Sequence, residues 1–133
     1  METLQTTSRY IPHIDKLGRI TAFYQVQRVS YNFVAVQDLP SKDNAVKFKM
    51  DNDYIRYMNY KEQLDEKENK KINVFEQEMF KFGRNKFTTI VVKQLLPGHC
   101  MFFAAGIYPH GTVIPKQSDA RSILVFHDFV PVN

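Results

Sequence analysis

The chain changes character twice along its length, and this pattern limits the folds that it can adopt. Residues 1–50 carry seven Lys or Arg against four Asp or Glu, residues 51–80 carry five against eight, and residues 81–133 carry six against two. The acidic middle has the apolar spacing of a polar helix, whereas the basic flanks alternate between apolar and polar residues, as strands do. The sequence therefore predicts a basic β framework with an acidic helical region set into it.

Three stretches before the acidic segment read as strands. Residues 19–26 alternate so that Ile20, Ala22 and Tyr24 can share one face, and residues 31–36 form a second β-type run. After a loop at 39–44, residues 45–50 alternate again, with Lys47 and Lys49 opposite Val46, Phe48 and Met50. Residues 1–18 have no such alternation, so we expect them to form an irregular N-terminal arm.

The acidic segment is predicted to be helical near residues 53–82. Asp51 and Asp53 offer N-cap oxygens, and the apolar residues that follow recur at helical spacing. Residues 65–71 are almost all charged and should be solvated. Residues 72–82 fit either a helix or the start of a strand; we favour a helix that runs to about Lys81 and ends at Gly83.

The remaining third of the chain is predicted to be strands and turns. Residues 86–95 form a strong strand, and Leu96–His99 has the proline and glycine of a tight turn. Residues 100–108 are nearly continuously apolar, which predicts a strand buried on both faces. A short strand at 112–114 and a last one at 122–130 complete the order.

This order predicts an α+β fold, mostly β, in a single domain over residues 1–133, with residues 1–18 available as an extended arm. Two architectures fit. One is a small antiparallel barrel, since a helix between the third and fourth strands resembles the order of elements in an OB-fold. The other is a two-sheet sandwich with the helical region inserted.

Composition adds expectations about environment. No run approaches the length of a membrane span, and residues 1–10 lack the apolar core of a secretory signal. The single cysteine, Cys100, excludes an intramolecular disulfide and fits a reducing compartment. We therefore expect no membrane association and an intracellular, cytoplasmic protein, in the host cell if the chain is viral.

Two sets of residues combine cations with aromatic rings, which is the mixture that single-stranded nucleic-acid sites use for phosphate neutralisation and base stacking. The first set lies between Phe80 and Phe87 and consists of Lys81, Phe82, Arg84 and Lys86. The second lies on the predicted early strands and consists of Arg19, Tyr24, Arg28, Tyr31, Lys47 and Lys49.

Enzymatic chemistry has little support in the sequence. The four histidines and Cys100 lack the paired spacing of a zinc site, so we expect no metal and no cofactor. Cys100 opens an apolar strand, where an inert thiol is expected. The carboxylates of the middle segment, namely Glu62, Asp65, Glu66, Glu68, Glu76 and Glu78, are expected on a solvated helix face, where pKa shifts are small.

The leading hypothesis from the sequence is a non-enzymatic domain that binds single-stranded nucleic acid. The alternative is a structural or assembly protein, such as a small virion-type component, that forms homo-oligomers through apolar strand surfaces. The outer faces of the strands discriminate the two: clustered cations with exposed tyrosine favour nucleic-acid binding, whereas exposed apolar side chains favour assembly.

Overall fold

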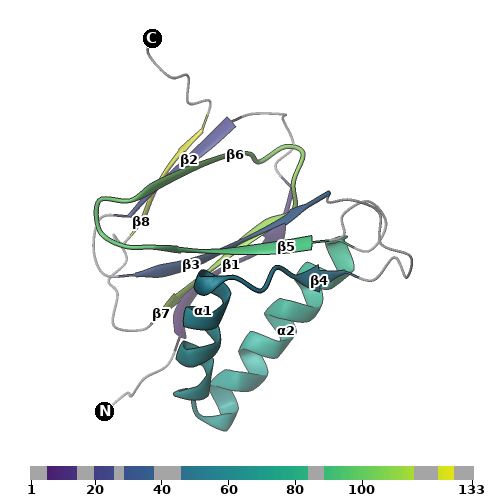
Figure 1. The fold of residues 1–133 in the computed structure, drawn as a ribbon, viewed down its shortest axis with the longest axis vertical. Helices are drawn as coiled ribbons and strands as arrows, with labels where there is room; N and C mark the ends of the chain where they lie inside the picture. Colours follow the sequence, from purple (N-terminus) through teal and green to yellow (C-terminus); the bar gives the residue numbers. More distant parts are fainter. Residues whose placement is uncertain are drawn as a thin grey trace.

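The computed structural model describes residues 6–14, 20–25, 29–37, 46–83, 89–115 and 123–127. These residues form three layers: a small sheet, a large sheet and a pair of helices (Figure 1). The large sheet has the strand order β1 (Thr6–His13), β7 (His110–Pro115), β3 (Ser30–Val36), β5 (Thr89–Leu95) and β4 (Lys47–Phe48). The small sheet has the order β6 (Cys100–Ala104), β2 (Ile20–Gln25) and β8 (Ile123–His127).

The fold is therefore α+β, as predicted, but the barrel alternative is wrong because the described strands form two separate sheets rather than a closed one. Consecutive strands β5 and β6 are joined by a turn but belong to different sheets. Within the large sheet β4 is parallel to β5, and the other pairs are antiparallel. Phe23, Leu95 and Ile114 pack together between the two sheets, and this apolar contact holds one sheet against the other.

The helical region was predicted in the correct place but consists of two helices. Helix α1 (Asn52–Glu62) begins where the Asp51 carboxylate accepts a hydrogen bond from the Tyr54 amide at 3.0 Å, as expected of an N-cap. Helix α2 (Glu66–Gly83) begins in the same way, because Asp65 accepts from the Glu68 amide at 2.8 Å. The stretch at 72–82, which fitted helix or strand, is helix.

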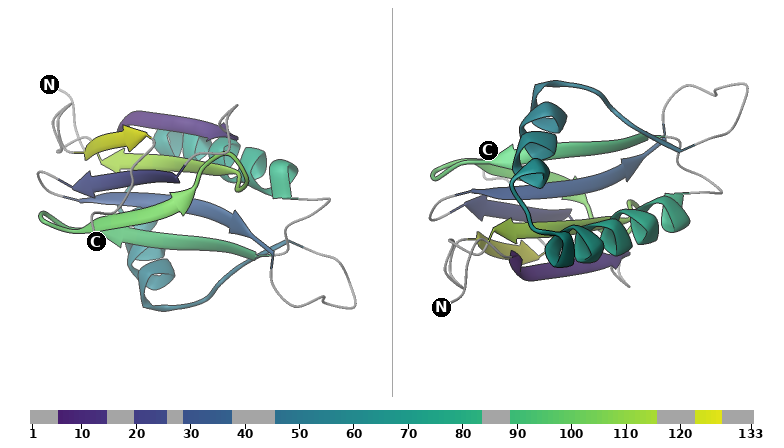
Figure 2. Two further views of the ribbon diagram at one scale, coloured as in Figure 1. Left: turned by 90° about the horizontal axis from the view of Figure 1, so that it is seen from above. Right: turned by 90° about the horizontal axis from the view of Figure 1, so that it is seen from below.

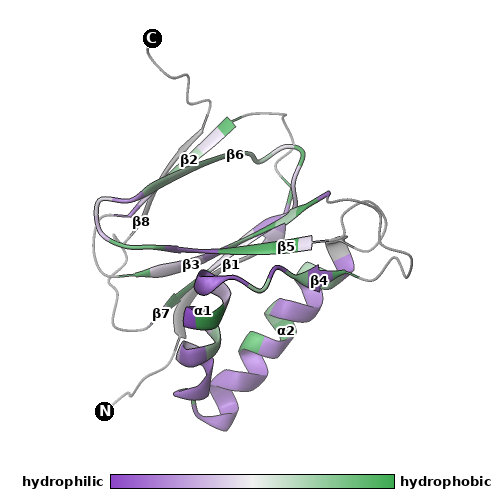
Figure 3. Ribbon diagram, viewed as in Figure 1, coloured by the Kyte–Doolittle hydropathy of each residue, from purple (hydrophilic) through white to green (hydrophobic). Residues whose placement is uncertain are grey.

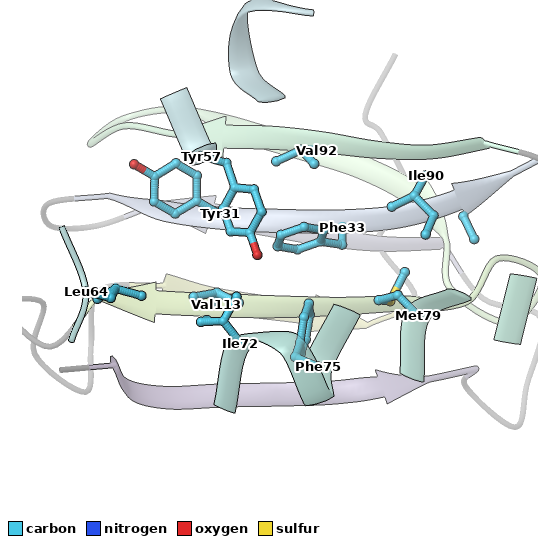
Figure 4. Packing of buried hydrophobic residues seen from close by; sticks show 11 residues of the cluster. Tyr31, Phe33, Tyr57, Leu64, Ile72, Phe75, Met79, Ile90, Val92 and Val113 are labelled. Atoms are coloured by element: carbon cyan, nitrogen blue, oxygen red, sulfur yellow. The ribbon is translucent and has the colours of Figure 1, made fainter. Parts of the chain in front are cut away.

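Both helices cover the same face of the large sheet (Figure 2). On β3, alternate residues Tyr31, Phe33 and Ala35 point toward the helices and join the main apolar cluster. The helices contribute Tyr57, Ile72, Phe75 and Met79, the turn between them contributes Leu64, and the neighbouring strands contribute Ile90, Val92 and Val113 (Figure 4). The other face of the large sheet carries the small sheet, so β3 and β7 are buried on both faces.

Two segments of the chain differ from what the sequence predicts. Residues 6–13, expected in an irregular arm, form β1 and pair with β7 through two register irregularities. The apolar run at 100–108 is not a strand buried on both faces: it gives the short edge strand β6, followed by a turn. One face of β6 packs toward the large sheet, while Cys100 and Phe102 are exposed. The Leu96–His99 turn forms as predicted, with Gly98 at a φ of 87° that favours glycine.

Candidate functional site

The structure describes only some of the residues that the sequence predicts to bind nucleic acid. Arg19, Arg28, Arg84 and Lys86 lie outside the described residues, and Phe82 is described only as a backbone position in α2. Four of the others are exposed, namely Tyr24, Lys47, Lys49 and Lys81. Tyr31 is buried.

The prediction that Tyr31 is a base-stacking residue is wrong. Its ring stacks on Tyr60 at 5.2 Å between centroids and tilts against Tyr57 at 5.6 Å, beneath the helices. Burial raises the pKa of its hydroxyl, which accepts a hydrogen bond from the Gln94 side chain. The alternation on β3 was read correctly, but the face that carries Tyr31 is the one that α1 and α2 cover.

The described lysines of the two predicted sets come from neighbouring elements. Phe48 of β4 packs against Phe80 of α2, with ring centroids 5.1 Å apart. Lys47 and Lys49 adjoin Phe48 in sequence, and Lys81 adjoins Phe80. Tyr24, by contrast, lies on β2 in the small sheet, which is a different layer of the molecule (Figure 1). The second predicted set is therefore divided between the two sheets.

The outer face of the small sheet is apolar. Residues directly opposite each other in an antiparallel pair share a face, and the register sets Cys100 opposite Tyr24, Phe102 opposite Ala22 and Ala104 opposite Ile20. None of these six residues is charged. Phe102 is 53% exposed, Ile20 46% and Tyr24 40%, whereas the alternate residues Thr21, Phe23 and Gln25 are buried against the large sheet. We call these six residues the outer face.

Hydropathy is distributed unevenly between the layers. Most residues of helix α2 are coloured as hydrophilic, whereas β6 and one end of β2 are coloured as hydrophobic (Figure 3). Cys100 is a free, exposed thiol on the outer face, and partial burial raises its pKa, so it lacks the acidified thiol of a reactive cysteine. The outer face therefore has the properties of a contact surface rather than of a reaction site.

The expectation that all six middle carboxylates are solvated is wrong for two of them. Glu76 is 9% exposed and accepts a hydrogen bond from the Tyr57 hydroxyl at 2.5 Å and from the Lys61 ammonium at 3.0 Å. Glu68 is fully buried and pairs with Lys71 at 3.0 Å. Each buried carboxylate thus has a cation partner, Lys71 one turn along α2 for Glu68 and Lys61 on α1 for Glu76, and this pairing makes its burial tolerable.

These carboxylates sit beside buried tyrosines. Burial, and next the negative charge of Glu76, raises the pKa of Tyr57 far above its usual value of 10. Burial also raises the pKa of Tyr60, whose hydroxyl is buried and has no hydrogen-bond partner in the described part of the chain. The hydrogen bond between Tyr57 on α1 and Glu76 on α2 joins the two helices, and both side chains are buried.

A second group of polar side chains, which no pattern in the sequence indicates, lies between the two sheets. The Thr112 hydroxyl donates to the Asn32 side-chain oxygen at 2.9 Å, Asn32 donates to Ser30, and Ser30 donates to Gln25 at 2.6 Å. All four side chains are fully buried. These four side chains therefore form hydrogen bonds with one another and link β7 and β3 of the large sheet to β2 of the small sheet.

The described histidines do not form a ligand or catalytic set with Cys100. Among the described residues no group of three or more potential ligands is placed to hold a metal ion. His99 accepts a hydrogen bond from the Leu96 amide within the β5–β6 turn, and His110 Nδ1 donates to the Tyr108 carbonyl at 2.8 Å. These contacts stabilise turns, and neither places a histidine beside Cys100 as a base.

Comparison of the chain with protein-family models, with curated proteins and with solved structures finds no match. Neither of the two described helices has the length and apolar character needed to span a bilayer.

Proposed function

We propose that this chain is a non-enzymatic assembly protein, built as a two-layer sandwich of sheets, whose copies associate through the outer face of the small sheet. The observation that carries the proposal is the exposure of Ile20, Tyr24 and Phe102 side by side on neighbouring strands. Contiguous exposed apolar side chains of this kind mark contact surfaces in soluble proteins. By the criterion set from the sequence, they favour assembly over nucleic-acid binding.

A second copy of the chain is the partner that fits this face best. A two-fold interface brings the same patch together from both molecules, so the patch must be compatible with itself. The six residues of the outer face carry no formal charge, whereas the whole chain carries a net charge of +4. Two copies therefore meet with least repulsion at a neutral surface, and stacked sheets pack about 10 Å apart in a known geometry.

The size of the face predicts weak association. The two strands that carry the outer face, with about five residues each, span roughly 16 Å by 10 Å, or about 160 Å² in projection. A stable interface buries about 800 Å² per partner. We therefore expect association that depends on concentration over the micromolar to millimolar range, rather than a permanent dimer.

Two residues of the outer face bear on the predictions made from the sequence. Tyr24 shares its face with apolar neighbours and with no described cation, so the predicted pairing of rings with cations on the early strands lacks support there. The exposed thiol of Cys100 is compatible with the reducing, intracellular compartment that the sequence led us to expect. We retain that compartment as part of the proposal.

The direct test compares Phe102→Lys with Ile55→Lys by sedimentation velocity over a range of concentrations. Both residues are 53% exposed, one on the outer face and the other on α1, so each variant adds one charge at an equally exposed apolar position. Because a two-fold interface loses the contact twice, Phe102→Lys should weaken dimerisation at least tenfold. Ile55→Lys should leave the dissociation constant within about twofold of the wild-type value.

Two results would contradict the proposal. One is a wild-type protein that stays monomeric up to millimolar concentration. The other is association that Ile55→Lys weakens as much as Phe102→Lys does, because charge alone, and not the outer face, would then control it.

A further inference from the structure

The apolar surface of the small sheet continues past the end of β6. This strand ends at Ala104, which the register sets opposite Ile20 on the outer face. The chain then makes one turn, residues 104–108, before it enters β7 in the large sheet (Figure 1). Within this turn Ile107 is 55% exposed, slightly more than Phe102 in the middle of β6. An exposed aliphatic side chain therefore follows directly on the border of the outer face.

Two hydrogen bonds fix the turn at 104–108 to the outer face. The Ala104 carbonyl accepts from the Ile107 amide at 3.0 Å and from the Tyr108 amide at 3.1 Å. These are the i+3 and i+4 bonds of a single helical turn, in which residues three apart lie on the same side. Because Ala104 belongs to the outer face, Ile107 shares its side of the molecule. Ala105 lies on another side of the turn and is fully buried.

This part of the chain carries no formal charge. Residues 94–115 contain no Asp, Glu, Lys or Arg, although the whole chain has a net charge of +4. The stretch includes β6, the turn at 104–108 and β7. It offers no ion pair to a charged partner, and it does not add to the repulsion between two molecules of the same net charge. A second copy of the chain is therefore the partner that fits this surface.

We propose that the interface between two copies extends from the outer face onto Ile107 in the turn at 104–108. This extension rests on the self-association proposed above and names a further residue that the association uses. The outer face is small beside the roughly 800 Å² per partner of a stable interface, so adjoining apolar surface adds to the area that a second copy can cover. Because Ile107 borders the outer face, a copy packed on that face also removes Ile107 from water.

The test compares Ile107→Lys with Val74→Lys by sedimentation velocity over a range of concentrations. Val74 lies on α2 and is 56% exposed, so each variant adds one charge at an equally exposed aliphatic position. Because a two-fold interface loses the contact twice, Ile107→Lys should raise the dissociation constant at least about fivefold, whereas Val74→Lys should leave it within about twofold of the wild-type value. Ile107→Leu keeps the apolar surface and should associate as the wild type does. Melting temperatures should be nearly equal, since both positions are on the surface.

The outcomes separate the extension from the proposed function. If Phe102→Lys weakens association and Ile107→Lys does not, the outer face remains the interface and its extension onto Ile107 is wrong. A wild-type protein that stays monomeric contradicts both. Equal weakening by Ile107→Lys and Val74→Lys would assign the effect to added charge and overturn the extension. Binding of monomeric protein to phosphatidylcholine vesicles, lost in Ile107→Lys, would assign this surface to a lipid bilayer rather than to a second copy.

Discussion

The two outer surfaces of the sheets are both apolar, but helices cover only one of them in the part of the chain that the structure describes. The large sheet presents Tyr31 and Phe33, which α1 and α2 bury almost completely. The small sheet presents Ile20, Tyr24 and Phe102, which stay about half exposed. Because an apolar sheet face is stable when another layer packs on it, the comparison supports the proposal that a second copy of the chain packs on the outer face.

The face of the large sheet that the helices cover also shows how the chain offsets the cost of burying charge. Helices α1 and α2 are amphipathic, yet they bring two carboxylates into the interior, each with a lysine partner. The outer face has no such polar pairs in its six residues. The internal layer is thus fixed by specific contacts, whereas the outer face offers a general apolar surface that suits reversible contact.

The largest effect should separate the two faces by stability. Phe33 is fully buried and contacts Phe48, Tyr57 and Phe75, so Phe33→Ala should lower the free energy of unfolding by about 3–5 kcal/mol. Phe102→Ala at low protein concentration should lower it by less than about 1 kcal/mol, because half of the ring is already in water. Urea denaturation measures both values, and equal losses would remove the distinction between the faces.

The next largest effect should be a loss of stability at alkaline pH, from tyrosines on the face that the helices cover. Burial raises the pKa of both Tyr57 and Tyr60, so the folded protein keeps these protons above pH 10, where the unfolded chain loses them. The stability that these raised pKa values contribute to the folded protein is complete below pH 10 and is lost as the pH rises. At pH 11 the free energy of unfolding has fallen by about 1.4 kcal/mol for each tyrosine. Urea midpoints at pH 8 and pH 11 measure the loss.

The controls for the pH experiment are Tyr57→Phe and Tyr60→Phe. Each variant should reduce the alkaline loss by about 1.4 kcal/mol, because the other titrating groups are common to all three proteins. A loss that neither variant changes would assign the alkaline sensitivity to other groups.

At neutral pH the same two variants should differ in a smaller way. Tyr57→Phe removes the hydrogen bond to the buried Glu76 and should cost about 1–2 kcal/mol. Tyr60→Phe removes a buried hydroxyl that has no partner in the described part of the chain, and should be neutral or slightly stabilising. A larger cost for Tyr60→Phe than for Tyr57→Phe would show that the polar contacts around these helices are assigned incorrectly.

Local patterns in the sequence predicted the elements better than their assembly. The alternation at Ile20–Tyr24, the cap at Asp51 and the turn at Gly98 depend on neighbouring residues, and each was predicted correctly. Burial depends on which layer covers a face, and the sequence carries no local sign of that. Tyr31 and Glu68 were therefore expected in water although both are buried, and Phe102 was expected in the core although it is exposed.

The candidate surfaces were predictable to the same degree. The apolar run that gives β6 was recognised as a possible contact between copies, but its register with β2, which brings Tyr24 and Phe102 to one face, required the structure. Likewise, the contact of Phe48 with Phe80, which sets β4 against α2, joins two segments that the sequence presents separately. Long-range pairing of this kind is set by tertiary packing rather than by local periodicity.

The most direct test of the central claim uses the single cysteine of the chain as a reporter. Cys100 lies on the outer face and is exposed in the monomer. If copies meet through that face, the rate of Cys100 alkylation by iodoacetamide should fall as protein concentration rises, in step with association measured by sedimentation, and Phe102→Lys should keep the rate high. An alkylation rate that stays constant while the protein associates would place the interface elsewhere and contradict the account.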